Sequence, residues 1–67
     1  MSPEKLAYMA NQIGRFFASQ KAASAVDGIE DHLRKFWDPR MRADLLAHLD
    51  AVTLDPQVRQ AVERLRA

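Results

Sequence analysis

The sequence predicts an all-α fold, a small compact bundle of about four short helices. Each of the three prolines follows a residue with a side-chain oxygen, in the pairs Ser2-Pro3, Asp38-Pro39 and Asp55-Pro56. Such a pair marks a helix start, because the oxygen accepts a backbone N–H and proline at the first helical position has no N–H to leave unpaired. Apolar residues also recur at helical spacing, without strand-like alternation. The helices are expected at about residues 3–20, 22–37, 39–51 and 56–66.

Each expected helix has an apolar arc when its residues are placed at about 100° intervals. In the first helix the arc consists of Leu6, Met9, Ala10, Ile13, Phe16 and Phe17. The second helix, which no proline marks, is inferred from the arc of Val26, Ile29, Leu33, Phe36 and Trp37. The third and fourth arcs are Met41, Leu45, His48, Leu49 and Val52, and then Val58, Ala61, Val62 and Leu65. We expect these arcs to face a core, with Phe36 buried and Trp37 either buried or at the surface.

The length and composition indicate one small domain over residues 1–67, since a chain of 67 residues buries only about 60% of its unfolded surface. It contains no cysteine, so neither disulfides nor thiolate metal sites can reinforce the core. Ten basic and nine acidic side chains give a net charge of +1, which is too balanced to indicate a nucleic acid or a membrane surface as partner. Neither a secretion signal nor an apolar run of roughly 20 residues is present, and we expect a cytoplasmic protein.

The stretch KFWDPRMR, residues 35–42, is the first candidate for a partner-binding site. Its Asp-Pro pair ends one helix and starts the next, so the corner is rigid. The position of Trp37 before the cap pairs it with Arg42, whose guanidinium could lie over the indole. Aromatic and arginine side chains beside a rigid turn have the composition of interface hot spots, although a solvated charged face is the simpler alternative. The predicted partner-binding residues here are Arg34, Phe36, Trp37, Arg40 and Arg42.

A second candidate surface lies on the first expected helix, opposite its apolar arc. Tyr8, Asn11 and Arg15 lie there together with Gln12 and Ser19. A tyrosine among amides on this side has no core to enter, so it is either simply exposed or part of an interface. We include Tyr8, Asn11 and Arg15 among the predicted partner-binding residues.

The residue patterns do not indicate catalysis or metal binding by this chain. His48 follows Asp44 by one turn, which predicts a structural hydrogen bond to that aspartate rather than a metal ligand. His32 has no second ligand at helical spacing. No serine or threonine has a base placed by a recognisable motif. Gly14 and Gly28, inside the first two helices, are expected to let neighbouring helices approach closely.

The sequence resembles the small delta subunit of the soluble, NAD-dependent, molybdenum-containing formate dehydrogenases. The resemblance lies in MANQIGRFF at residues 9–17 and HLRKFWDPRMR at 32–42, and more loosely in LDPQVRQAVERL at 54–65, so that it covers nearly the whole chain. The residues that match the family motif are Met9, Asn11, Gln12, Phe16, Phe17, Phe36, Trp37, Asp38, Pro39, Arg40, Met41 and Arg42.

The resemblance implies a non-catalytic subunit. The formate-oxidising site would belong to the large alpha subunit, and electrons would leave through beta and gamma subunits to NAD. The partner enzyme would carry bis-molybdopterin guanine dinucleotide, iron–sulfur clusters and FMN, whereas this chain would bind no cofactor itself. The delta chain would bind the alpha subunit and support either insertion of the molybdenum cofactor or stability of the assembly, with other subunits or a maturation chaperone as further partners.

Two other functions are compatible with short helices. A helix-turn-helix regulator would bind nucleic acid, but the basic residues here are interleaved with Asp38 and Asp44, and no expected helix has a mostly cationic face. Arg34, Arg40 and Arg42 could hold the phosphates of the pterin cofactor directly, but the sequence indicates no pocket for it. Self-association is also open, because the apolar arcs could close across a dimer. We therefore expect a helical module that binds the alpha subunit.

Overall fold

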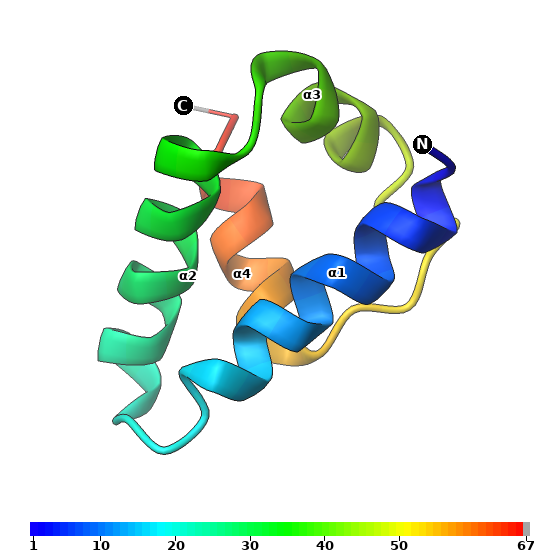
Figure 1. The fold of residues 1–67 in the computed structure, drawn as a ribbon. Helices are drawn as coiled ribbons and strands as arrows, with labels where there is room; N and C mark the ends of the chain where they lie inside the picture. Colours follow the sequence, from blue (N-terminus) through cyan, green and yellow to red (C-terminus); the bar gives the residue numbers. More distant parts are fainter. Residues whose placement is uncertain (67) are drawn as a thin grey trace.

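The computed structural model describes residues 1–66, which form four helices (Figure 1). The helices are α1 (Pro3–Phe16), α2 (Ala22–Phe36), α3 (Pro39–Ala47) and α4 (Pro56–Arg64). No strand occurs in the described part of the chain. The predicted all-α fold and the number of helices are therefore confirmed.

The three helices marked by proline begin where the sequence predicts, but only two use the predicted side-chain cap. The Ser2 hydroxyl accepts from the Lys5 backbone N–H at 3.2 Å, and the Asp38 carboxylate accepts from the Met41 N–H at 2.9 Å. The Asp55 side chain makes no capping bond at the start of α4. Instead, the backbone N–H of Asp55 donates to the Asn11 side-chain oxygen at 3.0 Å, so a residue of α1 fixes this corner.

The helices end earlier than predicted. The chain leaves α1 after residue 16 rather than 20, α3 after 47 rather than 51, α4 after 64 rather than 66, and α2 one residue early. Tighter turns with bonds between residues three apart replace the last helical turn, as between Gln20 and Phe17 and between Ala51 and His48. These turns contain no glycine in left-handed conformation, which is the usual sequence signal of a helix end.

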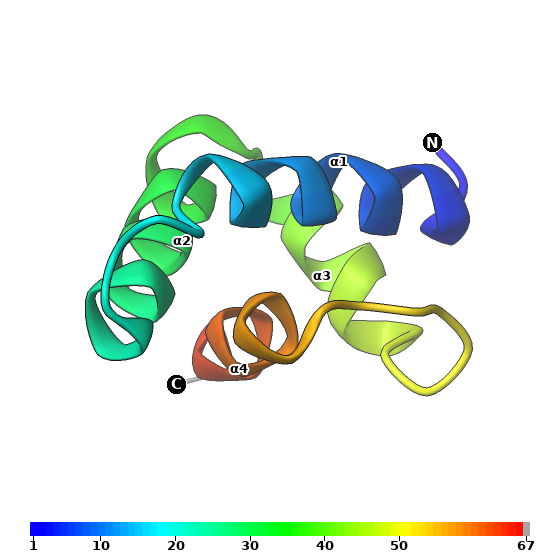
Figure 2. The ribbon, with the colours of Figure 1, turned by 90° about the horizontal axis from the view of Figure 1, so that it is seen from below.

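The helices pack around one another with α1 across the others. Figure 1 shows α2 and α4 side by side, and these two form the most extensive helix pair. α1 contacts all three other helices, and α3 contacts both α1 and α4, as the second view shows (Figure 2). Every helix therefore has a face toward the common centre.

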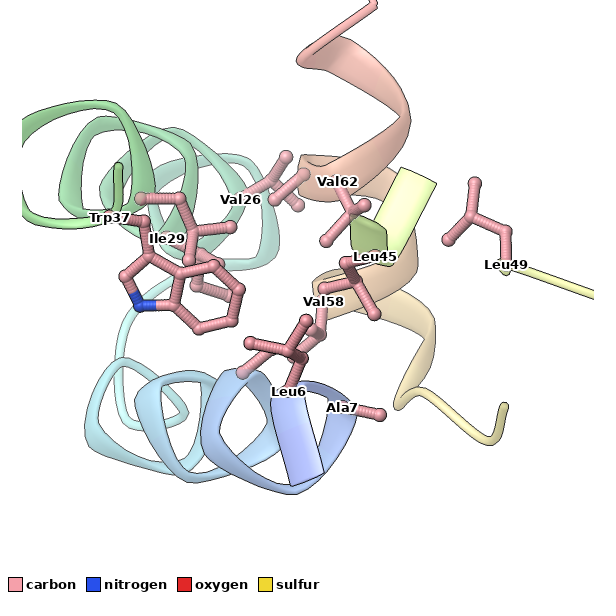
Figure 3. Close-up of a cluster of buried hydrophobic side chains, with 12 residues drawn as sticks. Leu6, Ala7, Val26, Ile29, Trp37, Leu45, Leu49, Val58 and Val62 are labelled. Carbon is pink, nitrogen blue, oxygen red and sulfur yellow. The ribbon is translucent and has the colours of Figure 1, made fainter. Parts of the chain in front are cut away.

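The core draws on all four helices and on the corner after α2 (Figure 3). The fully buried large side chains are Leu6, Val26, Ile29, Leu33, Leu45, Val58 and Val62. Trp37, only 6% exposed, joins them, and its indole points into the cluster beside Ile29. Leu49 is also buried, while Met41 and Val52 pack on the cluster from its edge.

Two phenylalanines of the predicted arcs lie outside the core. Phe36 is 73% exposed and Phe16 is 79% exposed, so the expectation that they are buried is wrong. The reason at Phe36 is that α2 ends there. Trp37 takes an extended backbone with φ −90° and ψ 138°, and its side chain enters the core in place of the phenyl ring.

The two glycines lie at close contacts between α1 and its neighbours. A Cβ on Gly14 would collide with the Cγ2 methyl of buried Val58, so the absence of a side chain lets α1 and α4 approach. A Cβ on Gly28 would lie 2.6 Å from Cε1 of Phe17, whose ring covers this part of α2. The predicted close approach of helices is confirmed at Gly14, whereas at Gly28 the missing side chain makes room for the Phe17 ring.

None of the helices over residues 1–66 combines the length and the apolar character that crossing a membrane requires.

Candidate partner-binding surfaces

Three of the five residues predicted at the 35–42 corner are engaged inside the molecule. Trp37 is part of the core. Arg34 donates from Nε to the Glu30 carboxylate and from Nη2 to the backbone carbonyl of Arg64, both at 3.0 Å. Arg42 donates from Nη1 to the backbone carbonyl of Arg34 at 3.0 Å. The last carbonyls of a helix have no hydrogen-bond partner within that helix. Arg34 therefore caps the C-terminal end of α4, and Arg42 caps the C-terminal end of α2.

The predicted stacking of Arg42 on the indole of Trp37 is wrong. No cation–π contact joins the two residues in the described structure, and the guanidinium is directed to the end of α2 instead. The burial of Trp37 gives the reason, because the indole ring on which Arg42 would stack faces the core.

Phe36 and Arg40 are the two predicted residues of this corner that face solvent and do not hold a helix end or enter the core. The phenyl ring of Phe36 lies against the imidazole of His32, with ring centroids 4.7 Å apart and planes inclined by 40°. Arg40, in the first turn of α3, is exposed and forms no ion pair with residues 1–66. These two side chains are available to a partner.

The second predicted surface is also divided between internal and external roles. Asn11 donates from Nδ2 to the Thr53 carbonyl and accepts at Oδ1 from the Asp55 N–H, both at 3.0 Å, so it clamps the loop before α4. Tyr8 is 62% exposed, and its hydroxyl accepts from Gln12 Nε2 at 2.7 Å. Arg15 is exposed beside a shallow apolar pocket between the end of α1 and the start of α4.

Arg64 joins α2 and α4, the most extensively packed helix pair, through two ion pairs that the sequence does not indicate. Arg64 Nη1 lies 2.6 Å from an Asp27 carboxylate oxygen and 3.5 Å from Glu30, which also binds Arg34. The hydrogen bond that Arg64 donates to Asp27 raises the pKa of the Arg64 guanidinium above its ordinary value, with Glu30 adding to it. Arg64 lies 34 or more positions along the chain from Asp27 and Glu30, so the helical spacing of the sequence does not predict these ion pairs.

Arg59 has a similar structural role on the other side of α4. Its Nη1 donates to the carbonyl of Leu49 at 3.0 Å and its Nη2 to the Asp50 carboxylate at 3.1 Å, which holds the turn after α3. Arg59 also pairs with Glu63, one helical turn further along α4, at a longer distance of 3.6 Å.

The two histidines do not form a metal site with the other described residues. Among residues 1–66, no group of three His, Cys, Asp or Glu side chains is placed to hold a metal ion. His48 bonds to Asp44 as predicted, but through Nδ1 to the backbone carbonyl at 2.8 Å rather than to the carboxylate. His48 is also exposed rather than part of the apolar arc, because α3 ends before it.

A family model described as the NADH-dependent formate dehydrogenase delta subunit FdsD matches residues 5–62. The chain belongs to this delta-subunit family. The matched range contains α1 from its third residue, all of α2 and α3, and most of α4, so membership covers the fold rather than one motif. No curated protein and no solved structure is significantly similar to the chain. A delta subunit is one component of a formate dehydrogenase complex, so a partner subunit is implied.

Proposed function

We propose that this delta chain is a non-catalytic accessory subunit that binds the alpha subunit of a formate dehydrogenase in the cytoplasm. Bound there, it supports insertion of the molybdenum cofactor or the stability of the assembly. The observation that carries the proposal is the family match over residues 5–62. In this view the bis-molybdopterin guanine dinucleotide, the iron–sulfur clusters and FMN belong to the partner enzyme.

The use of the polar side chains supports a binding role. Asn11, Arg34, Arg42 and Arg59 each make hydrogen bonds that hold helix ends or loops in place. Side chains used in this way keep a surface rigid, and a rigid surface loses less entropy when it binds a protein. Direct binding of pterin phosphates would draw on Arg34, Arg40 and Arg42, and the guanidinium groups of Arg34 and Arg42 are already bonded within the chain. We therefore favour the protein partner.

Co-purification with the alpha subunit tests the proposal. A tagged delta chain is mixed with purified alpha subunit, in one sample free of molybdenum cofactor and in another loaded with it. Retention mainly of the cofactor-free form supports a maturation role, and equal retention of both forms supports a structural subunit. A Leu33→Asp variant, which places a charge in the core, is the control for capture by an unfolded chain. Failure of the wild-type chain to retain either form would overturn the proposal.

A further inference from the structure

Two pairs of ring side chains, one at the end of α1 and one on α2, lie along the same side of the molecule. In the first pair, the Phe16 ring meets that of Phe17 edge to face, with centroids 5.2 Å apart and planes at 88°. The Phe17 ring in turn lies over Gly28 of α2. One turn along α2 stands His32, and one turn further Phe36, which contacts the imidazole. We name Phe16, Phe17, His32 and Phe36 the aromatic ridge.

The ridge continues into apolar surface that the core covers only in part. Met9 and Ile13 lie on the same side of α1 as Phe16, seven and three residues before it, and both are half-buried at the edge of the core. Phe16 and Phe36 themselves are largely exposed. Phenylalanine is among the residues most often buried, and a contiguous exposed apolar patch on a small protein marks an interaction surface.

The carboxylates of α1 and α2 are directed away from the ridge or are paired. Glu4 lines a pocket with Tyr8 on the other side of α1. Asp27 and Glu30 face α4, where they bind Arg64. Asp31, the remaining acid of α2, pairs with Lys35 at 3.0 Å.

Unpaired cations precede and follow the apolar line that runs from Met9 and Ile13 through the ridge. Lys5 lies one turn before Met9 on α1, and Arg40 follows Phe36 by four residues across the corner. Neither forms an ion pair with the described residues. The mainly apolar line from Met9 to Phe36 therefore has one unpaired cation before it and one after it.

We propose that the aromatic ridge is the docking surface for an amphipathic helix of the alpha subunit, whose apolar stripe is flanked by Asp or Glu. Ridge residues one helical turn apart suit the i, i+3, i+4 and i+7 anchors of such a helix, and acidic flanks match Lys5 and Arg40. In a two-fold dimer of this chain, by contrast, a ridge would meet its own copy and bring like charges together. This proposal rests on the proposed function and specifies its interface.

The first test compares aromatic truncations on the two sides of α1. The affinity of purified alpha subunit for the full delta chain is measured with Phe16→Ala, Phe36→Ala and the double variant, and with Tyr8→Ala as the matched control. Each ridge variant is expected to weaken binding at least about tenfold, as truncation of a hot-spot aromatic does, while the Tyr8 variant changes it less than about twofold. Both phenylalanines are exposed, so thermal melting by circular dichroism should show all the variants folded.

The second test addresses the charge of the partner. Lys5→Glu and Arg40→Glu should each weaken binding, and the double reversal should also flatten the dependence of the affinity on salt. Arg15→Glu is the comparison on the other side of α1, where this exposed arginine lines the pocket at the start of α4. Charge reversals that leave affinity and salt dependence unchanged would overturn the acidic character assigned to the partner.

The third test identifies the occupant. A photo-crosslinking benzoylphenylalanine in place of Phe36 should attach to an alpha-subunit peptide with a helical apolar stripe and an acidic net charge, which mass spectrometry reads directly. The same group in place of Tyr8 should attach weakly or not at all. A crosslink from position 36 to a second delta chain, or to a basic segment, would overturn the assignment.

The outcomes separate the two proposals. If the wild-type chain binds the alpha subunit and both phenylalanine variants bind it equally well, the ridge is not the docking surface, and the proposed function still stands. Loss of binding on Tyr8→Ala alone would move the interface to the opposite side of α1. Wild-type chain that does not bind the alpha subunit would refute both.

Discussion

Asn11 is a single residue that holds the connection between α3 and α4 through both ends of its side-chain amide. Replacing it by alanine removes the donor to Thr53 and the acceptor for Asp55 together. Each such bond contributes on the order of 1 kcal/mol, and the sites are partly open to water, so Asn11→Ala is expected to lower the free energy of unfolding by about 1–2 kcal/mol. Urea denaturation followed by circular dichroism gives this value.

Two further variants sharpen that experiment. Asn11→Asp keeps the oxygen that accepts from Asp55 but loses the donor to Thr53. The free energy of unfolding should therefore fall by about half as much as in Asn11→Ala. Gln12→Ala removes an exposed amide that bonds only to Tyr8, and should change the stability by less than about 0.5 kcal/mol. Equal stability of the Asn11→Ala and wild-type chains would show that water replaces both contacts.

The neighbours Phe36 and Trp37 should respond in opposite ways to truncation. Trp37→Ala removes a core indole at a cost of about 3–5 kcal/mol, which approaches the whole stability of a domain this small. The variant should lose most of its helical circular dichroism at 25 °C. Phe36→Ala should keep its helicity and shift the free energy of unfolding by less than about 0.5 kcal/mol. A folded Trp37→Ala chain would contradict the packing described for the indole.

The same pair shows what helical periodicity can predict at residue scale. An apolar arc correctly predicts buried residues in the middle of α2, such as Ile29 and Leu33. At the end of the helix the next residue takes extended backbone, and the angular relation between neighbours no longer holds. Composition therefore suggests Phe36 and Arg40 as partner-binding residues, while the exposure of Phe36 is evident only from the structure.

At the scale of helices, the caps of α3 and α4 differ although both begin with Asp-Pro. Asp38 accepts a bond from the first turn of α3, so Asp38→Ala should lower the free energy of unfolding by about 1 kcal/mol. Asp55 makes no such bond, and Asp55→Ala should change it by less than about 0.5 kcal/mol. Urea midpoints of the two variants, measured side by side, check the contrast. A larger effect at Asp55 than at Asp38 would contradict it.

The crossing of α1 and α4 depends on the missing side chain at Gly14. Alanine there gains up to about 1 kcal/mol in helix propensity but forces a methyl against Val58, and overpacking of a core costs about 1–3 kcal/mol. Gly14→Ala is therefore expected to be destabilising overall. In a Val58→Ala background the same change should be neutral or stabilising, and a double-mutant cycle by urea denaturation measures the coupling. Additive effects of the two substitutions would contradict the contact.

Helix starts were predictable and helix ends were not, for a physical reason. Proline and its preceding oxygen act locally, so α1, α3 and α4 begin where the sequence indicates. The ends are set by tertiary contacts, as where Arg59 holds the turn after α3 and Arg34 closes the end of α4. Such contacts join residues 10 and 30 positions apart, and no local pattern reports them. Family membership, in contrast, was evident from the blocks at 9–17 and 32–42.

At the scale of the whole molecule, one core shared by four short helices couples their stabilities. Each helix contributes to the buried cluster, so opening of one exposes apolar surface on the others. A chain of this size has a stability of only a few kcal/mol by the usual value per residue. A partner that binds only the folded chain should therefore raise its free energy of unfolding measurably.

Hydrogen exchange of the core amides provides that measurement. For a ligand at about 100 times its dissociation constant, mass action adds about 2.7 kcal/mol and slows exchange through global unfolding about 100-fold. With purified alpha subunit in that excess, we expect this slowing in peptides from α2 and α4, the most extensively packed pair. The Phe16→Ala, Phe36→Ala double variant, at the same concentrations, should show much less slowing because the ridge is truncated. Binding that left core exchange of the wild-type chain unchanged would mean that the alpha subunit also holds the unfolded chain, as a chaperone does, rather than the folded one.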